Sequence, residues 1–428
     1  MDKLKKILFD NMVTILFVIL CLIGIKFSNQ PMVYILNELV ERIVRNSFIV
    51  LSLIIPVLAG MGLNFGIVIG AMAAQIAIIA VTHFKITGIY GFLMSVVLTI
   101  PISILFGYLT GKLLNKTKGQ EMIASMILGF FANGLYQLLF LFLVGTLIPM
   151  NNPVLVLSGG VGIKNTIDLS EGIKYALDGI LKVPLFNFTL YVSILFMTYY
   201  IFKFIKERKS DNKDSINYKH LYKMTPYLIL VLISLVAIYG KGLLSNSSIR
   251  SLKIIPMLNM INVPVVTVLV ILILCIFNMF ILNTKLGQDF KAVGQDMHIA
   301  KVSGINVDKI RVIAITISTL LAGIGQLIFL QNIGTLNTYG SHEQVGMFAI
   351  AALLIGGASV SKATIGQAIV GTILFHTLFI VSPQAGKNLL GSAQIGEYFR
   401  VFVAYGVIGL SLGLHAFKKQ IQSKSDLK

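Results

Sequence analysis

Uncharged polar side chains inside long apolar runs are the groups of this sequence best suited to contact a solute. The set comprises Asn64, Gln75, Asn133, Gln137, Asn278, Gln326 and Gln367, together with one histidine, His376. Each alone could serve as a hydrogen bond between two helices, which is the commoner use of such residues in membranes. Together they predict a path lined by amides and backbone carbonyls, which suits a neutral polyhydroxyl compound or a nucleobase.

Glycines gather around Asn64, where Gly60, Gly62 and Gly66 lie between two apolar runs. Because exposed backbone at membrane depth is tolerated only where it is buried in protein or lines a cavity, this spacing predicts a helix broken near residues 60–70. Glycines four residues apart also let helices approach closely. The residues expected to line the path are Asn64, Gly66, Gly70, Gln75, Asn133, Gln137 and Gln326.

The sequence does not contain the motifs that would drive transport or catalysis from within the chain. The nearest approach to a phosphate-binding loop, from Gly107 to Leu113, has the wrong spacing and lacks the hydroxyl residue. There is no Cys/His cluster for a metal and no arrangement of nucleophile and base. We therefore expect a chain that is not an enzyme, has no cofactor of its own, and leaves any ATP to a partner subunit.

The composition is that of a membrane protein. Of 428 residues, 56% are hydrophobic and 12% are charged, and the mean hydropathy is +0.87, whereas a soluble domain carries about 25% charge. The net charge of +18 indicates basic cytoplasmic loops rather than nucleic-acid binding. Cys21 and Cys275 both lie in apolar runs, so they do not reveal the redox compartment.

Apolar runs recur along the whole chain. They lie near residues 7–27, 47–63, 66–84, 89–111, 122–148, 186–205, 225–244, 263–283, 310–330, 346–360, 364–382 and 398–417. A span needs roughly 20 apolar residues, so we expect an all-α polytopic bundle of about 10–12 transmembrane helices in one domain, residues 1–428. Lys3, Lys5 and Lys6 precede the first run without a small-residue cleavage site after it, which favours a retained helix over a signal peptide.

The distribution of Lys and Arg predicts the orientation. Starting from a cytoplasmic N-terminus and crossing once per run, most of the basic residues fall on the cytoplasmic side. This predicts that both termini are cytoplasmic. It also predicts an external loop at 149–185, a basic cytoplasmic loop at 203–224 and a further cytoplasmic loop at 284–311.

The loop at 284–311 has an apolar pattern of its own. Apolar and charged residues alternate at helical spacing, and Gly294 and Gly304 interrupt them, which predicts two short helices. Asp296 stands where its carboxylate could cap the second of these, and Asn306 begins the next span with similar chemistry. A short rigid helix could pass on the movement of a separate motor. The pattern alone also allows a plain connection between two spans.

The segment from Gly287 to Gly325 resembles the coupling region of a known family of permeases. The matching residues are Gly287, Ala292, Val293, Gly294, Asp296, Ala300, Ser303, Gly304, Ile305, Asn306, Val307, Lys309, Leu321, Ala322 and Gly323. Stretches 60–75 and 349–372 are similar to two Gly-rich motifs of the same family. These are the permease subunits of bacterial ABC importers for ribose and other simple sugars, branched-chain amino acids and nucleosides. The region 145–262 is less typical of the family.

This resemblance implies a permease that forms the translocation path for a small polar solute and is coupled to a separate ABC ATPase subunit. It implies that the loop docks on the ATPase through Phe290, Ala292, Val293, Gly294, Asp296, Ala300 and Gly304. Further implied partners are a second permease subunit, identical or different, and an extracytoplasmic solute-binding protein or lipoprotein. The implied location is the lipid bilayer of a bacterial cytoplasmic membrane.

A stand-alone, ion-coupled secondary transporter is the first alternative. Such a carrier needs an ionisable group within its spans. The sequence interpretation finds almost none, because Asp10, Glu121 and Arg400 are at span ends and Glu343 is in a loop. His376 is the one candidate relay.

A membrane-embedded transferase is the second alternative. It would need a cluster of acidic or histidine residues at one membrane face. The external loop offers only Asp168, Glu171 and Asp178 for that purpose.

Overall fold

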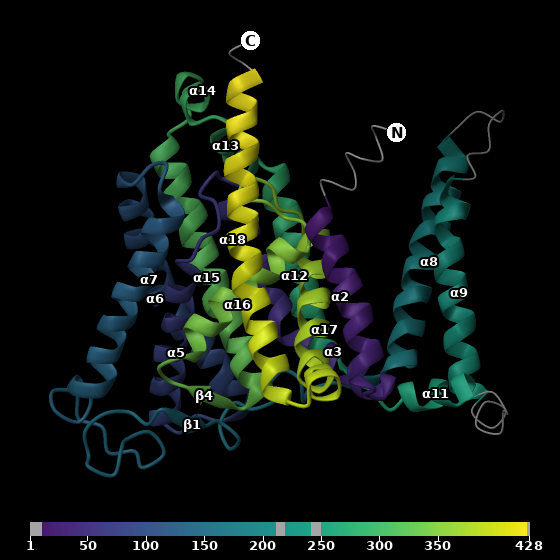
Figure 1. Ribbon diagram of the computed structural model, residues 1–428, viewed down its shortest axis with the longest axis horizontal. Coiled ribbons are helices and arrows are strands. Elements are labelled where there is room, and N and C mark those ends of the chain that lie inside the picture. Colours follow the sequence, from purple (N-terminus) through teal and green to yellow (C-terminus); the bar gives the residue numbers. More distant parts are fainter. Residues whose placement is uncertain (1–10, 211–218, 241–249, 426–428) are drawn as a thin grey trace. The chain divides into compact units, whose positions relative to one another are not determined.

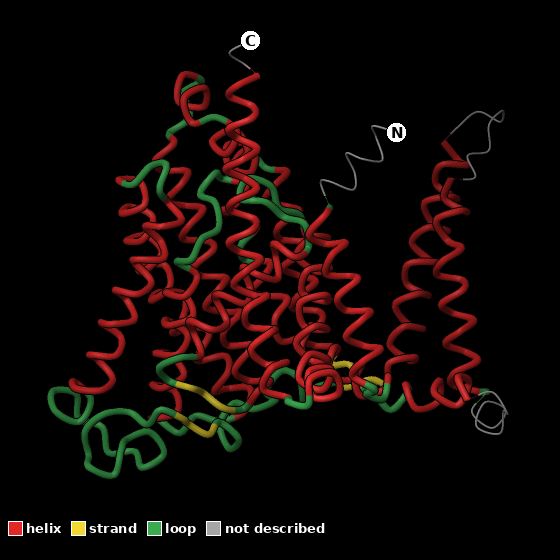
Figure 2. The backbone as a smooth tube through the Cα atoms, viewed as in Figure 1, coloured by secondary structure: helices red, strands yellow, loops and turns green. Residues whose placement is uncertain are grey.

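The structure is a computed structural model that describes residues 11–210, 219–240 and 250–425. Helices make up most of it, loops join them, and the strands are four short segments (Figure 2). This confirms the predicted all-α polytopic class, which follows because a bilayer offers the backbone no hydrogen-bond partners and a helix satisfies its own. The early residues Lys3, Lys5, Lys6 and Asp10 lie outside the described residues.

Most of the helices follow one another with short connections, and a long loop joins the π-helix to α8. They are α2 (Met12–Ser28), α3 (Met32–Leu51), α4 (Ile54–Leu58), α5 (Ile67–His83), α6 (Gly88–Lys116), α7 (Glu121–Leu138), a π-helix (Leu139–Leu143), α8 (Leu185–Ser210), α9 (Lys219–Tyr239), α11 (Arg250–Leu258), α12 (Val265–Asn283), α13 (Lys285–Gln295), α14 (Met297–Val302), α15 (Val307–Ile333), α16 (Ser341–Ile355), α17 (Ile365–Leu390) and α18 (Ala393–Ser425).

Among the described residues, seven helices are long and apolar enough to cross a bilayer. Three shorter apolar helices, α2, α5 and α16, bring the candidates to ten, within the predicted range. Helix α3 was not expected, because its two acidic and two basic residues lower its hydropathy below that of the neighbouring runs.

The chain divides into two compact units where the sequence predicts one domain. The first comprises residues 1–30, 41–180 and 266–428, and the second comprises residues 31–40 and 181–265. In the second, α8 packs along α9, and Phe196 stacks on Tyr227 with ring centroids 5.1 Å apart. Strands β2 (Lys182–Pro184) and β3 (Asn262–Pro264) pair antiparallel beneath them.

The predicted basic loop at 203–224 is shorter than expected. Helix α8 continues to Ser210 and α9 begins at Lys219, while residues 211–218 lie outside the described residues. The physical reason is that the Lys, Glu and Arg residues after Phe202 are good helix formers, so the helix continues beyond its apolar run.

In the first unit, α5 lies in the interior and is buried on almost every side. Glycines set its spacing from α15: a Cβ added at Gly70 would lie 2.2 Å from the Thr319 carbonyl oxygen. A Cβ at Gly107 of α6 would lie 2.8 Å from the Thr316 Cα and 3.1 Å from the Thr319 Cβ. Helix α15 is therefore held by backbone-to-backbone approach between α5 and α6, as small residues permit in membranes.

The two predicted loops of this unit lie at its opposite ends (Figure 1). The loop with α13 and α14 is at one end, together with the C-terminal part of α18. At the other end, β1 (Thr166–Asp168) of the external loop pairs antiparallel with β4 (Thr335–Asn337), with Ile167 opposite Leu336. Helix α16 begins at Ser341, just after β4. The β1–β4 pair therefore helps to position the first residues of α16.

Replacing Gly371 by alanine should destabilise the fold, whereas Gly366→Ala, five residues earlier on α17, should not. A Cβ at Gly371 would lie 1.9 Å from the Ala352 carbonyl oxygen on α16, but one at Gly366 meets nothing within 4 Å. We expect a loss of about 1–3 kcal/mol for Gly371→Ala and a neutral or slightly favourable change for Gly366→Ala. The melting temperature of each variant in detergent is measured by the labelling of the buried Cys21 thiol with a dye as the protein unfolds. Equal melting curves would contradict this packing.

Candidate coupling and translocation site

The predicted break near residues 60–70 is present between α4 and α5. Gly60 and Gly62 adopt φ of 71° and 67°, which L side chains rarely adopt. The Asn64 side-chain oxygen accepts a hydrogen bond from the Gly66 N–H at 2.9 Å, an Asx-type turn. The Phe65 N–H donates to the Ser125 hydroxyl of α7 at 3.2 Å. Two N–H groups of the unwound segment thus find side-chain partners inside the protein.

The loop between α12 and α15 forms the two predicted short helices. Thr284 caps α13 by accepting from the Gly287 N–H. The Asp296 carboxylate caps α14, accepting from the N–H groups of His298 at 2.7 Å and Ile299 at 3.0 Å. Helix α13 runs through Gly294, where the sequence predicted its break, because the Asp296 cap starts the next helix two residues later. The Asn306 cap of α15 is confirmed.

The electrostatics of the α14 cap keep it charged. Hydrogen bonds from the backbone of Ile299 and of His298 hold the pKa of the Asp296 carboxyl below its ordinary value. A carboxyl whose pKa is lowered by folding contributes its stabilisation at neutral pH and loses it only as the pH falls through that lowered pKa. The second short helix is therefore capped throughout the physiological range.

The inner side of these helices is apolar and packs on the broken helix. Phe290, Val293 and Ala300 are buried, and Ala292 is partly buried. Their cluster includes residues from the break and from the ends of α6 and α15: Ile55, Ala59, Met61, Leu114, Val307, Ile310, Ala314 and Ile315. This is the amphipathic pattern that the sequence predicted.

Gly294 packs directly against the backbone of the broken helix. A Cβ there would lie 2.1 Å from the Leu58 carbonyl oxygen, and a Cβ at Gly60 would lie 2.8 Å from the Gly294 Cα. With the two backbones in direct contact, α13 cannot shift without displacing the unwound segment.

The outer side of α14 is apolar and exposed. The side chains of Ile299 and Val302 are 64% and 77% exposed, and Gly304, with φ of 80°, turns the chain back toward α15. Exposed apolar side chains at the tip of a projecting loop are typical of a surface that contacts another protein.

A buried ion pair that the sequence interpretation missed joins the base of this loop to α7. The Arg311 guanidinium is fully buried and donates to Glu121 Oε1 at 2.6 Å. It also donates to the Leu114 carbonyl oxygen at 3.4 Å and to Met297 Sδ at 3.0 Å. One side chain thus joins the end of α6, the start of α7 and the first residue of α14. The sequence signal that could have revealed this ion pair is an arginine within the apolar run Ile310–Ile313, because a buried arginine needs a carboxylate partner.

Several of the predicted path residues meet around the start of α16. His342 is buried, with Nδ1 2.9 Å from the Gln75 side-chain oxygen and Nε2 3.0 Å from that of Asn133. The Asn133 amide also donates to the Glu343 carboxylate. On α15, Gln326 donates to the Ser341 hydroxyl at 3.1 Å. The amide network consists of Gln75, Asn133, Gln326, Ser341, His342 and Glu343.

Sequence reasoning found the amides of this network but not its histidine. His342 and Glu343 follow a loop, and their place on a buried helix depends on the β1–β4 pairing. Two amide atoms of the network, Gln75 Nε2 and Gln326 Oε1, are buried without a hydrogen-bond partner in the structure. Such atoms are available to a polar solute or to water.

The remaining predicted path residues lie elsewhere. Gly66 packs against Asn64 and Thr110 at the break, and Gly70 contacts α15. Gln137 is half-buried on α7, about one turn beyond Asn133. Two other amides link segments: Asn278 donates to the Leu51 carbonyl at 3.3 Å and Gln367 to the Gly357 carbonyl at 2.7 Å.

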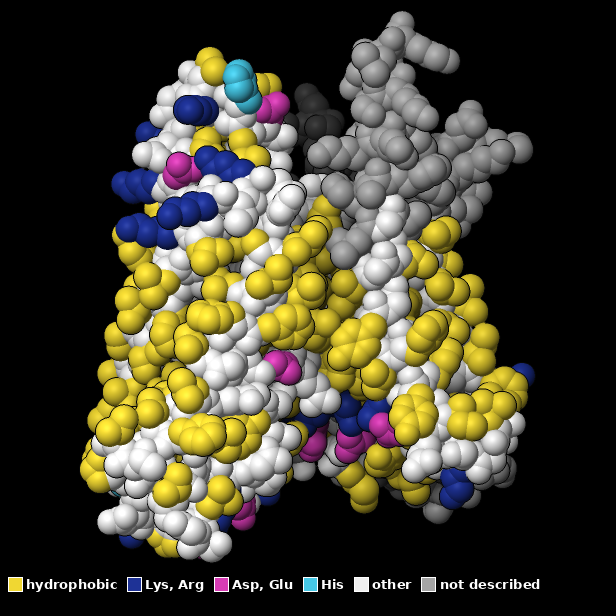
Figure 3. Space-filling model, turned by 60° about the vertical axis from the view of Figure 1, so that its left-hand side comes forward, with side chains coloured by type: hydrophobic (Ala, Val, Ile, Leu, Met, Phe, Trp, Pro, Cys, Tyr) yellow, Lys and Arg dark blue, Asp and Glu magenta, His cyan; other side chains and the backbone are white. Residues whose placement is uncertain are grey.

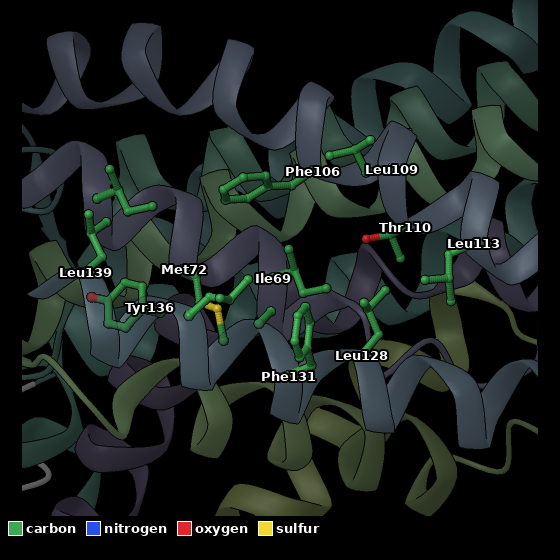
Figure 4. Close-up of a pocket in the computed structure, with 13 residues that line it drawn as sticks. Ile69, Met72, Phe106, Leu109, Thr110, Leu113, Leu128, Phe131, Tyr136 and Leu139 are labelled. Atoms are coloured by element: carbon green, nitrogen blue, oxygen red, sulfur yellow. The ribbon is translucent and has the colours of Figure 1, made fainter.

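An apolar pocket of about 300 Å³ lies beside the amide network, between α5, α6 and α7 (Figure 4). Tyr136 and Thr110 are its polar lining residues, and apolar side chains such as Met72 and Phe131 make up the rest. The Tyr136 ring lies 5.1 Å from the His342 ring, so it separates the pocket from the network. An apolar lining does not suit a polar solute.

Charged residues also lie on a helix outside the ten candidate spans. Helix α3 carries Arg42 and Arg45, both half-buried, in a segment not expected as a helix. Both arginines are within electrostatic reach of His376. His376 is buried beside Phe375 and Phe379, with ring centroids 5.2 and 6.4 Å away.

The acids of the external loop have structural roles. Asp178 is buried and accepts hydrogen bonds from Thr267 and, at 2.6 Å, from Asn332. Asp168 accepts from the Ser170 N–H at 2.8 Å. In the part of the chain that the structure describes, no three His, Cys, Asp or Glu residues are grouped as metal ligands.

A membrane-spanning bundle with an interrupted helix buried at its centre and packed against a capped loop is the architecture of a multi-pass transport subunit. The family model described as branched-chain amino acid transport system / permease component matches residues 46–411, and the chain belongs to this family. This confirms the resemblance seen in the three motifs.

Three relatives illustrate the range of similar permeases. The chain is 28% identical to the xylose transport system permease protein of Haemophilus influenzae over 32% of its length and 35% of the relative's. It is 30% identical to the ribose import permease protein of Escherichia coli over 30% of the chain and 38% of the relative. It is 31% identical to the autoinducer 2 import system permease protein of Photorhabdus luminescens over 29% of the chain and 35% of the relative. The chain thus spans little more than a third of these relatives. No solved structure matches it.

Breaking the buried pair by Glu121→Gln or Arg311→Met should destabilise the protein by about 3–5 kcal/mol, because each change leaves a buried charge without its partner. Lys118→Gln is the matched control: Lys118 joins the same two segments through Asp308 at 2.6 Å, but both side chains are exposed, so about 1 kcal/mol or less is expected.

Chemical unfolding in detergent measures all three variants. The double variant Arg311→Met, Glu121→Leu should recover part of the loss, because apolar groups can replace a buried pair. If Lys118→Gln and Glu121→Gln were equally damaging, burial would not be the source of the effect.

Proposed function

We propose that this chain is the permease subunit of an ATP-binding cassette importer. The observation that carries the proposal is a backbone contact between Gly294 and Leu58. Gly294 belongs to the loop at 284–311, called the coupling loop from here on, and Leu58 ends α4 at the broken helix. A loop that merely connected two spans would need neither two capped helices nor a contact with an unwound segment.

The force for transport would enter at α14. The exposed Ile299 and Val302 would seat in a groove of a separate ABC ATPase subunit, which binds the ATP. The cap at Asp296 keeps α14 a rigid unit, so that movement is transmitted rather than absorbed. From α13 the displacement would reach the break through Gly294, and through Arg311 it would reach α7.

The solute would be a small polar compound, with a simple sugar or a nucleoside favoured. The amide network offers neutral donors and acceptors, which match hydroxyl groups and nucleobases better than they match ions. The names of the three relatives refer to xylose, ribose and autoinducer 2. The solute would pass near His342, where the network's two unpartnered amide atoms are available to it.

The assembly would include further subunits. A second permease, identical or different, would complete the path, and an extracytoplasmic solute-binding protein or lipoprotein would deliver the solute. The end that carries α14 would face the cytoplasm of a bacterium, in the cytoplasmic membrane. The beginning of α2 and the end of α18 point to that same end (Figure 1), which supports cytoplasmic termini.

Replacing Asp296 by alanine should uncouple ATP hydrolysis from uptake, whereas Asp296→Asn should preserve coupling. The alanine removes the acceptor for two backbone N–H groups, and the asparagine amide oxygen replaces it. Proteoliposomes that contain the permease, its ATPase and its binding protein allow solute uptake and ATP turnover to be measured together.

For Asp296→Ala we expect ATP turnover that no longer responds to solute, with uptake strongly reduced. Full coupling in that variant would refute the role of the α14 cap. Uptake in membranes without any ATPase, driven by an ion gradient and abolished by His376→Gln, would replace the whole proposal with a secondary transporter.

Asn133→Leu should weaken solute recognition, because it removes the amide that joins His342 and Glu343 in the network and that could hydrogen-bond the solute. We expect the KM for uptake to rise about tenfold, the effect of roughly 1–1.5 kcal/mol for one hydrogen bond. Asn278→Leu is the control, since that amide bonds only the Leu51 carbonyl among the contacts that the structure gives it. It should lower thermal stability and leave KM unchanged. If both variants changed KM alike, the network would not be the recognition site.

A further inference from the structure

A groove of about 960 Å³ runs between α6 and α15. Its walls are almost wholly apolar, with Ile104 and Leu105 on α6 and Ile313 and Ile317 on α15. The side chains of Ile104 and Leu105 are 43% and 55% exposed, so the groove is accessible from the side of the helix pair. The transport mechanism described above does not use it.

The floor of the groove is fixed by glycine contacts. A Cβ at Gly107 would lie 2.8 Å from the Thr316 Cα, and one at Gly111 would lie 2.9 Å from the Val312 Cα. Thr316 and Val312 both line the groove. Because the two backbones touch there, the groove cannot close by a small movement of either helix.

One end of the groove is basic. Lys112 and Lys309 line it, and the Lys112 ammonium lies 4.6 Å from the centre of the Tyr108 ring. Asp308 also lies there, but its carboxylate pairs with Lys118 at 2.6 Å. Its carbonyl accepts from the Asn115 amide at 2.8 Å. With two lining lysines and an aspartate that is paired with Lys118, this end has an excess of positive charge.

The dimensions match one leaflet of a bilayer. Pro101 and Lys112 both line the groove and are eleven residues apart on α6, which corresponds to about 16 Å along a helix. The hydrocarbon of one leaflet is about 15 Å thick, half of a core of about 30 Å. Figure 3 shows the same order on the surface: near the end that carries α14, Lys and Arg side chains lie above a broad hydrophobic area.

We propose that this groove binds one anionic glycerophospholipid, with its acyl chain along the apolar walls and its phosphate between Lys112 and Lys309. Charge complementarity supports this occupant, because basic pockets between helices on the cytoplasmic side attract anionic head groups. A bound lipid would brace α6 against the first turns of α15, which follow directly on the coupling loop. The proposal requires a chain in a membrane but does not depend on ATP-driven import.

The test is native mass spectrometry of the full-length protein in detergent with equal amounts of phosphatidylglycerol and phosphatidylcholine. We expect one phosphatidylglycerol to be retained in preference. The variant Lys112→Gln, Lys309→Gln should bind it roughly tenfold more weakly. Leu105→Trp, which fills the groove without changing its charge, should reduce retention of both lipids.

The control variant is Lys116→Gln, Lys301→Gln, which removes two exposed lysines at the same end that do not line the groove. It should retain phosphatidylglycerol as the unmodified protein does. The proposal is overturned if this control loses the lipid equally, or if both lipids are retained alike. It is also overturned if millimolar inorganic phosphate displaces the lipid, or if the lysine variant changes the amount of dimer instead.

Discussion

The Arg311–Glu121 ion pair is the constraint on which the α14 end of the first unit depends. A guanidinium without access to water requires a carboxylate and further acceptors in fixed positions, because a buried charge is tolerated only when it is paired and hydrogen-bonded. Glu121, the Leu114 carbonyl and the Met297 sulfur supply acceptors for its two terminal nitrogens. The α6–α7 turn and the start of α14 must therefore converge on one side chain of α15, and the loop that carries α14 has little freedom of position.

From that point the contacts continue along α7. Glu121 begins the helix, Ser125 accepts the Phe65 N–H from the unwound segment one turn later, and Asn133 reaches His342 two turns further on. The broken helix is thus held from two sides, by α13 through Gly294 and by α7 through Ser125. Each contact involves backbone or a short buried side chain, so the coupling loop and the amide network can move little relative to each other.

Features set by neighbouring residues could be predicted from the sequence. The caps at Asp296 and Asn306, the apolar side of α13 and the break after α4 all depend on residues within a few positions of one another. Features set by distant residues could not. Glu121 and Arg311 are 190 positions apart, and as single residues they resemble ordinary flanking charges. Helix α3 was missed because its charges mask its apolar side, and His342 because only the folded chain brings it to Gln75 and Asn133.

The short β1–β4 ribbon has a consequence for the opposite membrane face. It ties the external loop to the residues just before Ser341, while α15, which ends at Ile333 immediately before β4, begins beside the coupling loop. One rigid rod therefore connects the two faces of the protein. Thermodynamic reciprocity then applies: if the state of one face alters affinity at the other, occupancy of the second must bias the first by the same free energy. A change of contacts at the β1–β4 end is in this way transmitted to the end that carries α14 without any separate messenger.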